Sequence, residues 1–313
     1  MIWLIGAGPM AIEYAKVLNA QSVSFICITR SDNSATKLKS ITGNVAHTGG
    51  LQPFLSNNPT IPQYAIVATG IESLAWVTEL LLRYGVTSIL VEKPAGISFQ
   101  QIENIQNLVK LSNANVFVAY NRRFYESVRT AQKMIAEDGG ATSLTYEITE
   151  WSHAIDKLDI DKDTKRNWFI ANTSHVVDLA FYLGGKPKEL ASFTQGNTNW
   201  HDRSAIFAGA GITDIGVLFS YTGNWNAPGR WSLDVSTSKR RYIFRPLEKL
   251  QIQKIGEVEN VIVQMDNELD VNFKPGVFLQ VEAFLNEDAK TLCGINEHMA
   301  NLSLYCKMAN YEI

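Results

Sequence analysis

The sequence predicts an α/β protein in two domains: a doubly wound parallel sheet, then an α+β domain on an open, mostly antiparallel sheet. Three observations indicate this fold class. An apolar strand at residues 2–5 runs into a Gly-x-Gly-x-x-Ala turn and a helix with apolar positions at helical spacing. Short apolar strands and helices then alternate as far as residue 120, and long β-like stretches follow. We therefore place the domains at residues 1–121 and 122–313.

The elements follow in order along the first domain. After the first helix, strands are expected at residues 23–29, around 44–47, and at 64–69, 88–91 and 115–120, with a helix at 73–84. In the second domain, helices are expected at 126–137, 173–183, 277–285 and 296–310. Its β-like runs are residues 143–149, 189–195, 212–221, 231–237 and 241–244.

Composition excludes several classes of partner. The chain has 313 residues, 46% of them hydrophobic, and a net charge of -3, which gives no reason to expect nucleic acid or an acidic membrane surface. A strand that begins at residue 2 leaves no room for a signal peptide, and no apolar run approaches the ~20 residues of a membrane helix. The three cysteines lack metal-ligand spacing, so we expect reduced thiols, no metal and a cytoplasmic protein.

The glycine turn at residues 6–11 points to a dinucleotide phosphate. Gly6 permits a turn that a Cβ would block, Gly8 lets the backbone approach a pyrophosphate, and Pro9 suits the first helical turn. The amides at the helix start then face the phosphates with a favourable dipole. The expected cofactor contacts are Gly6, Ala7, Gly8, Pro9 and Met10, together with Arg30, Ser31, Thr69, Glu92 and Lys93.

The end of the second strand bears on the choice of cofactor. An NAD enzyme usually carries an acid there for the ribose hydroxyls, whereas this chain has Thr29-Arg30-Ser31. Arg30 and Ser31 suit a 2′-phosphate, so we favour NADP over NAD. Two alternatives stay open: Arg30 as a solvated loop charge, and Asp32 as the residue that reaches the ribose.

Three stretches together resemble the glucose–fructose oxidoreductase / inositol dehydrogenase (Gfo/Idh/MocA) family. They are the glycine turn at residues 6–11, which we call the Gly6 loop, and the segments Val91-Glu92-Lys93-Pro94 and Ser174-His175-Val176-Val177-Asp178. The resemblance implies a Rossmann domain, a second domain whose open sheet makes homo-oligomer contacts, and hydride transfer between NAD(P) and an alcohol or ketone of a sugar, nucleotide sugar or polyol. The sequence departs from the family pattern where Ala171 stands in place of an aspartate, and at Gly70, Ile71 and Leu74 after the fourth strand.

Lys93 and His175 are the expected catalytic residues. Lys93 follows a central strand, where open α/β sheets bind ligands, and its ammonium suits a substrate oxygen; a surface lysine in a Lys-Pro turn is the alternative. His175 is the expected proton carrier, since the reference pKa of histidine is about 6.5. If Asn172 is the helix N-cap, the dipole favours a neutral imidazole at His175.

The expected substrate contacts each have a structural alternative. Arg122 and Arg123 either clamp a phosphate or carboxylate or form interdomain salt bridges. Tyr120 faces either the core or a cleft, and Asn172 is a cap, a substrate ligand or both. Asp178 either orients His175 or bonds backbone. Tryptophans of the second domain cover a sheet or stack on sugar rings: Trp151, Trp168, Trp200, Trp225 and Trp231.

Two further functions stay open beside the oxidoreductase. Ala171 motivates a dinucleotide-binding sensor or partner protein without turnover. Some relatives cleave glycosides with tightly held NAD, and cofactor that stays bound through gel filtration would favour that reading.

Overall fold

The computed structural model describes residues 1–311, in two compact units. The first unit contains Met1–Asn121 and Leu269–Ala300, and the second contains Arg122–Glu268 and the chain from Asn301 onward. The continuous second domain expected at 122–313 is corrected, because residues 269–300 return to the first unit.

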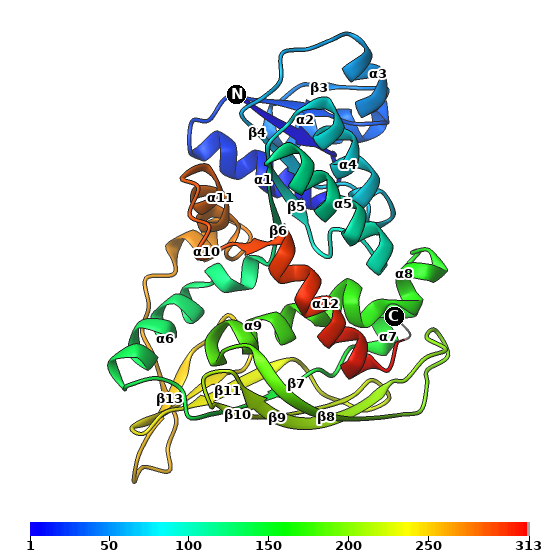
Figure 1. Cartoon of the computed structure of the whole chain (residues 1–313). Helices are drawn as coiled ribbons and strands as arrows, with labels where there is room; N and C mark the ends of the chain where they lie inside the picture. Colours follow the sequence, from blue (N-terminus) through cyan, green and yellow to red (C-terminus); the bar gives the residue numbers. More distant parts are fainter. Residues whose placement is uncertain (312–313) are drawn as a thin grey trace. The chain divides into compact units, whose positions relative to one another are not determined.

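The first unit is built on a seven-stranded sheet in the order β15-β6-β5-β4-β1-β2-β3 (Figure 1). Its strands are β1 (Ile2–Ile5), β2 (Phe25–Ile28), β3 (Ala46–His47), β4 (Tyr64–Val67), β5 (Ser88–Glu92), β6 (Asn115–Ala119) and β15 (Cys293–Gly294). All pairings are parallel except that of β15 with β6, which confirms the predicted doubly wound sheet. The chain order reverses between β1 and β4, so the carboxyl ends of these strands form the switch point at which such sheets bind ligands.

The helices of this unit follow the predicted alternation. They are α1 (Pro9–Ala20), α2 (Asp32–Thr42), α3 (Leu51–Ser56), α4 (Leu74–Tyr84), α5 (Phe99–Ser112) and α11 (Val277–Leu285), with a 3₁₀ turn at Ile71–Ser73. Three elements adjoin or cross the unit boundary: a 3₁₀ turn at Asn121–Phe124, α10 (Glu268–Asn272) and α12 (Ile295–Ala309). Every residue of β1 is buried, which explains why that strand reads as a continuous apolar run.

Residues 269–300 return to the first unit because they complete its sheet and its core. Cys293 pairs with Val118 at the sheet edge, which covers the open side of β6. Phe284 of α11 packs edge-on against Tyr64 and Phe117, with ring centroids 5.4 and 6.2 Å away. Local sequence patterns carry no information on such distant packing.

The second unit is built on an eight-stranded sheet in the order β14-β13-β12-β11-β7-β10-β9-β8. Only β7 and β10 run parallel, so the expectation of a mostly antiparallel open sheet is confirmed. The strands are β7 (Ser143–Glu147), β8 (Pro187–Gln195), β9 (Ile206–Thr213), β10 (Leu218–Asn224), β11 (Ser232–Ser236), β12 (Arg240–Phe244), β13 (Gln251–Lys254) and β14 (Val261–Ile262).

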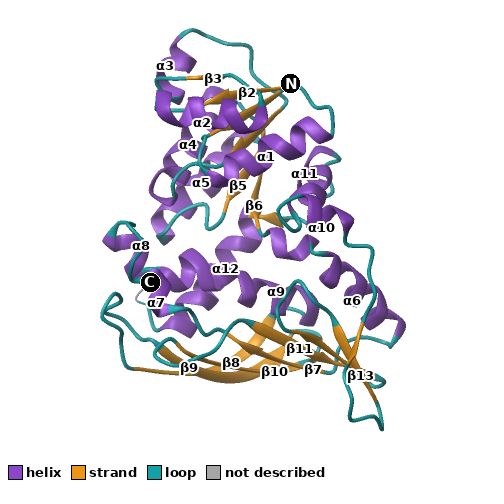
Figure 2. Cartoon of the chain, turned by 180° about the vertical axis from the view of Figure 1, so that it is seen from behind, coloured by secondary structure: helices purple, strands orange, loops and turns teal. Residues whose placement is uncertain are grey.

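One face of this sheet is covered by α9 (Ser174–Gly184), which packs on β7 and β11 (Figure 2). Alternate residues of β10 are buried and exposed, as expected for a sheet with one packed face. The remaining helices are α6 (Glu126–Glu137), α7 (Ser152–Ile155), α8 (Lys162–Arg166) and a π-helical turn at Phe169–Thr173.

The β-like run expected at residues 212–221 is divided by a turn into the end of β9 and the start of β10. The chain turns between β9 and β10, where the Gly216 amide donates to the Thr213 carbonyl at 3.0 Å. Gly216 lies in this turn with φ +85°, a backbone conformation that favours glycine. The alternation of apolar residues continues across the turn and hides it from a pattern-based prediction.

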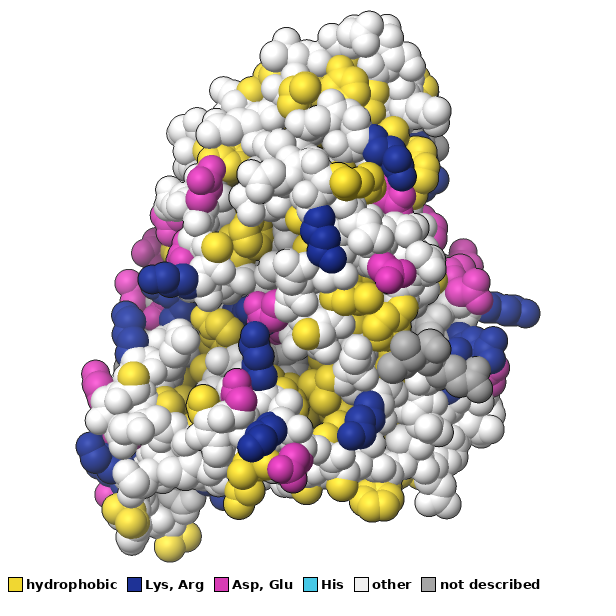
Figure 3. Space-filling model, in the orientation of Figure 1, with side chains coloured by type: hydrophobic (Ala, Val, Ile, Leu, Met, Phe, Trp, Pro, Cys, Tyr) yellow, Lys and Arg dark blue, Asp and Glu magenta, His cyan; other side chains and the backbone are white. Residues whose placement is uncertain are grey.

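Charged side chains of both signs are interspersed on the face of the molecule shown in Figure 3. Among residues 1–311, every helix is too short or too polar to cross a membrane.

Candidate active-site residues

The Gly6 loop joins β1 to α1 at the switch point of the first sheet. Gly6 has φ +121°, and a Cβ on it would lie 2.2 Å from the Ala68 carbonyl oxygen, so close strand packing requires this glycine. Gly8 differs, because a Cβ there would have no atom of the chain within 4 Å. Gly8 and Pro9 are exposed and Met10 is half-exposed, while Ala7 is buried. The backbone at Gly8 thus faces open space at a helix start, which fits a dinucleotide pyrophosphate.

The ends of β4 and β5 place Thr69, Glu92 and Lys93 at the same edge of the sheet. Val67 of β4 pairs with both Ile5 of β1 and Val91 of β5, so Thr69 follows the strand next to β1 and Lys93 follows the strand beyond it. Thr69 and Lys93 are both half-exposed, and the peptide bond between Lys93 and Pro94 is cis. The structure therefore brings these residues to the carboxyl edge of the first sheet.

Glu92 has a structural contact. The Tyr14 hydroxyl donates a 2.6 Å hydrogen bond to Glu92 Oε1, which ties α1 to β5. Loss of hydration raises the pKa of Glu92, although the Tyr14 bond and the charges of Lys93 and Lys274 act in the opposite direction. This carboxylate thus fixes the helix that carries the glycine loop.

At the end of β2 the Arg30 side chain is 79% exposed and lies 3.8 Å from the Glu72 carboxylate. Ser31 is the N-cap of α2: its hydroxyl accepts from the Ser34 amide at 3.1 Å. The exposed guanidinium of Arg30 is therefore able to reach a ligand. The Ser31 hydroxyl, in contrast, already accepts a hydrogen bond from an amide of α2.

The helix that carries His175 does not begin where the sequence suggests. A π-helical turn at Phe169–Thr173 runs directly into α9, so Asn172 lies inside helical chain and is not its N-cap. Because no helix begins at Asn172, the helix dipole gives no reason to expect a neutral ring at His175. His175 is buried, and its ring centroid lies 6.2 Å from that of Trp231.

Glu150 is a residue that the sequence reasoning missed. It is buried, and it accepts hydrogen bonds from Asn172 Nδ2 at 3.1 and 3.2 Å and from the Thr173 hydroxyl at 2.6 Å. These bonds hold the π-helical turn directly before His175. A lone glutamate at the end of a β-like run gave no signal for this role, although π-turns are frequent at functional sites.

Arg123 and Asp178 pair with each other. Arg123 Nε donates to Asp178 Oδ2 at 2.8 Å, and Nη2 donates to Oδ1 at 2.5 Å, with both side chains at most 3% exposed. This salt bridge lies inside the second unit, and the alternative role of Arg123 as a substrate clamp stays a prediction. Asp178 accepts both of these hydrogen bonds, and its expected contact with the His175 ring or with backbone stays a prediction.

Arg122 lies over aromatic rings of the second unit. Its guanidinium carbon is 4.9 Å from the ring centroid of Trp231 and 5.9 Å from that of Tyr125. Tyr120, by contrast, is 1% exposed in the first unit, with its hydroxyl 3.3 Å from His298 Nδ1. Of the two positions expected for the Tyr120 side chain, core or cleft, the structure shows the core.

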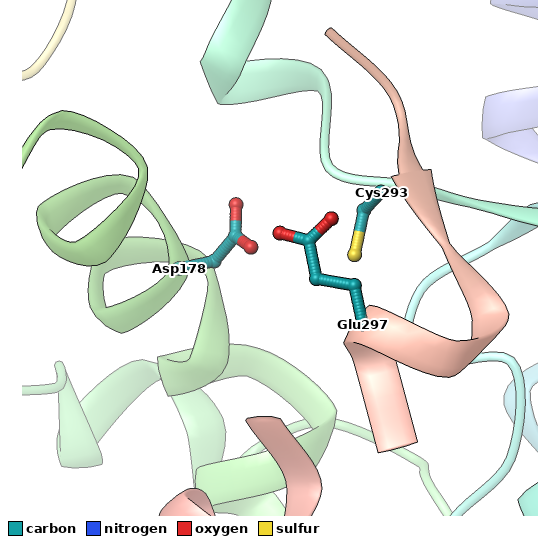
Figure 4. Close-up of side chains that lie close together, drawn as sticks. All are labelled: Asp178, Cys293 and Glu297. Atoms are coloured by element: carbon teal, nitrogen blue, oxygen red, sulfur yellow. The ribbon is translucent and has the colours of Figure 1, made fainter. Parts of the chain in front are cut away.

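Figure 4 shows the side chains of Cys293 and Glu297 beside each other in the first unit. The Cys293 sulfur and a Glu297 carboxylate oxygen lie within 4.8 Å of each other. Two donors fall short of the four that a structural zinc ion takes, so this pair by itself carries no metal assignment.

The Rossmann architecture and the Gly6 loop agree with a family comparison. Residues 1–120 match the model of an oxidoreductase family with an NAD-binding Rossmann fold, Gfo/Idh/MocA. The match covers less than half of the chain, so residues 1–120 are similar to the NAD-binding domain of this family. A comparison with curated protein sequences finds none that matches.

Solved structures similar to this chain share the fold over nearly its whole length. An NADPH-dependent oxidoreductase from Desulfitobacterium hafniense is 16% identical with a TM-score of 0.80, over 99% of this chain and 94% of that one. A levoglucosan dehydrogenase solved with NADH is 15% identical with a TM-score of 0.79, over 99% and 95%. UDP-N-acetylglucosamine 3-dehydrogenase from Acidithiobacillus ferrooxidans is 15% identical with a TM-score of 0.75, over 98% and 95%.

Proposed function

We propose that the chain transfers hydride between NADP or NAD and a secondary alcohol or ketone of a sugar, nucleotide sugar or polyol. The observation that carries the proposal is the open backbone at Gly8, at the switch point of a domain that matches an NAD-binding oxidoreductase family. Similar structures are named for NADPH-dependent, levoglucosan and UDP-sugar oxidoreductases, which supports the nicotinamide cofactor and the carbohydrate class.

The nicotinamide ring supplies hydride chemistry at its C4 atom when it is bound, and the side chains supply position and proton transfer. Lys93, at the carboxyl end of β5, hydrogen-bonds the reacting oxygen of the substrate through its ammonium group. His175 takes the hydroxyl proton during oxidation and returns it during reduction. Glu150 fixes the π-turn that precedes His175 through Asn172 and Thr173.

NADP is the cofactor we favour. The support is Arg30, whose exposed guanidinium follows β2 at a position where NAD enzymes usually carry an acid. Glu72, 3.8 Å away, competes for the same charge, and Asp32 at the start of α2 is the candidate for a ribose contact if NAD is used instead.

Oligomer formation and compartment complete the proposal. The outer face of the second sheet exposes apolar side chains, Phe193 at 72% and Leu218 at 59%, and we assign this face to a homo-oligomer contact. Cys27, Cys293 and Cys306 are free buried thiols, which fits a reducing cytoplasm.

A substrate screen tests the proposal. The protein is incubated with NADP or NAD and a panel of sugars, uronic acids, nucleotide sugars and polyols, and the absorbance of reduced nicotinamide is followed. We expect cofactor consumption that depends on one substrate class. Tight dinucleotide binding without turnover of any compound in the panel would contradict the proposal. It would favour a sensor without turnover, the function that Ala171 suggests. Cofactor that stays bound through gel filtration and is regenerated in each cycle would favour glycoside cleavage.

A further inference from the structure

Trp231 lies at the centre of a cationic cluster that we define by four residues: Arg122, Arg230, Trp151 and Trp231. The Arg122 and Arg230 guanidinium carbons lie 4.9 and 5.3 Å from the Trp231 ring centroid. Arg230 also stacks on Trp151, at 4.3 Å from its ring centroid. All four residues belong to the second unit.

The two arginines differ from the other arginines nearby in having no acidic partner. Arg123 is neutralised by Asp178, and Arg245 by Glu147 at 3.4 Å. Within residues 1–311, Arg122 and Arg230 have aromatic contacts but no carboxylate at ion-pair distance. Two like charges around one indole repel each other, and an anion bound between them would relieve that repulsion.

The cluster is also held in place before any ligand binds. Trp151 is 48% exposed, yet its indole Nε1 donates to the Gly229 carbonyl at 3.1 Å and so fixes the ring under Arg230. Trp231 is 4% exposed, and its indole N–H has no acceptor among the described residues. A buried donor without an acceptor needs an explanation, and a ligand oxygen supplies one.

The cluster lies near His175, the residue that we propose carries the proton. The Trp231 ring that Arg122 and Arg230 share lies 6.2 Å from the ring of His175, centroid to centroid. A sugar that presents its hydroxyl to His175 would therefore have a neighbouring substituent within reach of the two guanidinium groups.

We propose that the Arg122–Arg230 cluster binds an anionic group of the substrate, so that the substrate is an acidic sugar derivative and not a neutral sugar. The anion is a carboxylate, as in a uronic acid, or a phosphate, as in a sugar phosphate or nucleotide sugar. Guanidinium groups recognise both through paired hydrogen bonds. This inference rests on the proposed function, because it takes His175 as the residue at the reacting hydroxyl.

Calorimetric binding of matched ligands tests the cluster. The probes are glucose, glucuronic acid, glucose 1-phosphate and UDP-glucose, each with the wild type and with the Arg122→Gln/Arg230→Gln double variant. We expect at least one acidic probe to bind the wild type about 10- to 100-fold tighter than glucose, and the double variant to lose that preference. If the site recognises a carboxylate, glucuronic acid should bind most tightly. If it recognises a phosphate, glucose 1-phosphate or UDP-glucose should bind most tightly.

Arg203→Gln is the matched control, because Arg203 also stacks on an aromatic ring of the second unit, 4.4 Å from that of Tyr311. It should keep the preference for acidic probes. Equal binding of glucose and all acidic probes, or an unchanged preference in a folded double variant, would overturn the inference. If acidic probes bind through the arginines but none is oxidised or reduced with NAD(P), the proposed function fails and the anion site stands.

Discussion

Arg123 and Asp178 lie 55 positions apart in the sequence and form a buried two-point ion pair inside the second unit. The geometry matches the planar fork of a guanidinium to the two oxygens of a carboxylate. It joins the segment after β6 to the helix that carries His175, so the pair fixes α9 within its own unit.

Removing one partner of this pair should be costly. Asp178→Asn removes the negative charge that accepts two hydrogen bonds from the buried Arg123, so we expect the free energy of unfolding to fall by about 3–5 kcal/mol. Denaturant titration measures it. The Arg123→Met/Asp178→Leu double variant removes both charges and should recover part of the loss. A single variant as stable as the wild type would contradict the buried pairing.

The lowered pKa of Asp138 predicts how the stability of the fold depends on pH. Burial acts to raise its pKa, but hydrogen bonds from Arg240, Tyr242 and Thr237 outweigh burial and hold the pKa below its ordinary value of 3.8. The ionised form is therefore favoured in the folded state. Its contribution to stability is complete above the unfolded pKa and is lost as the pH falls through the lower folded pKa.

We expect Asp138→Asn to lower the free energy of unfolding by about 2–3 kcal/mol at neutral pH, since charged hydrogen bonds are lost. The difference from the wild type should shrink below about pH 4, as the wild-type carboxyl is protonated. Unfolding is measured over a pH series. Asp202→Asn, at an exposed ion pair 3.6 Å from Arg166, serves as the control and should change stability by less than about 1 kcal/mol. A pH-independent difference for Asp138→Asn would argue against the depressed pKa.

Arg30 tests the choice of cofactor. Arg30→Ala removes a charge-assisted bond to the 2′-phosphate, so NADP binding should weaken by about 1.5–3 kcal/mol while NAD binding changes little. Calorimetric titration of both dinucleotides measures this. Arg83→Ala, an exposed arginine of the same unit that pairs with Glu79, should leave both affinities unchanged. Equal losses for both cofactors would assign the preference to Asp32 or the backbone.

Gly8 tests the position of the pyrophosphate. A Cβ at Gly8 meets no atom of the chain within 4 Å, so Gly8→Val should fold and yet fill the space where phosphate binds. We expect dinucleotide binding to be abolished, with the thermal unfolding midpoint nearly unchanged. Gly294→Val is the control, because Gly294 also has open space around its Cβ position and lies in the same unit. Unchanged NADP affinity in Gly8→Val would refute the assignment.

The sequence predicts features that depend on local pattern. The Gly6 loop, α6 and α11 are found at or within one residue of their expected bounds, because caps, glycines and apolar spacing act over a few residues. Pairings between distant segments are not encoded locally. The Asp178 partner, the bonds of Glu150 to the π-turn and the return of residues 269–300 to the first sheet all depend on tertiary packing. The cap predicted at Asn172 failed for the same reason, since Glu150 binds its amide.

In the reaction that we propose, His175 carries the proton and NAD(P) carries the hydride. His175→Asn keeps the polarity and approximate size of the side chain but removes the titrating group. His201→Asn is the matched control, because His201 is also buried in the second unit beside an indole, with its ring 5.0 Å from that of Trp225.

The most direct measurement is the turnover number of wild type, His175→Asn and His201→Asn with the best substrate of the screen, alongside their dissociation constants for NADP. We predict that His175→Asn lowers turnover by about 10²–10⁴-fold, the usual range for a positioned proton carrier, while NADP affinity hardly changes. His201→Asn should retain turnover close to that of the wild type. Full turnover in His175→Asn would contradict the account and move the proton-transfer role to Lys93.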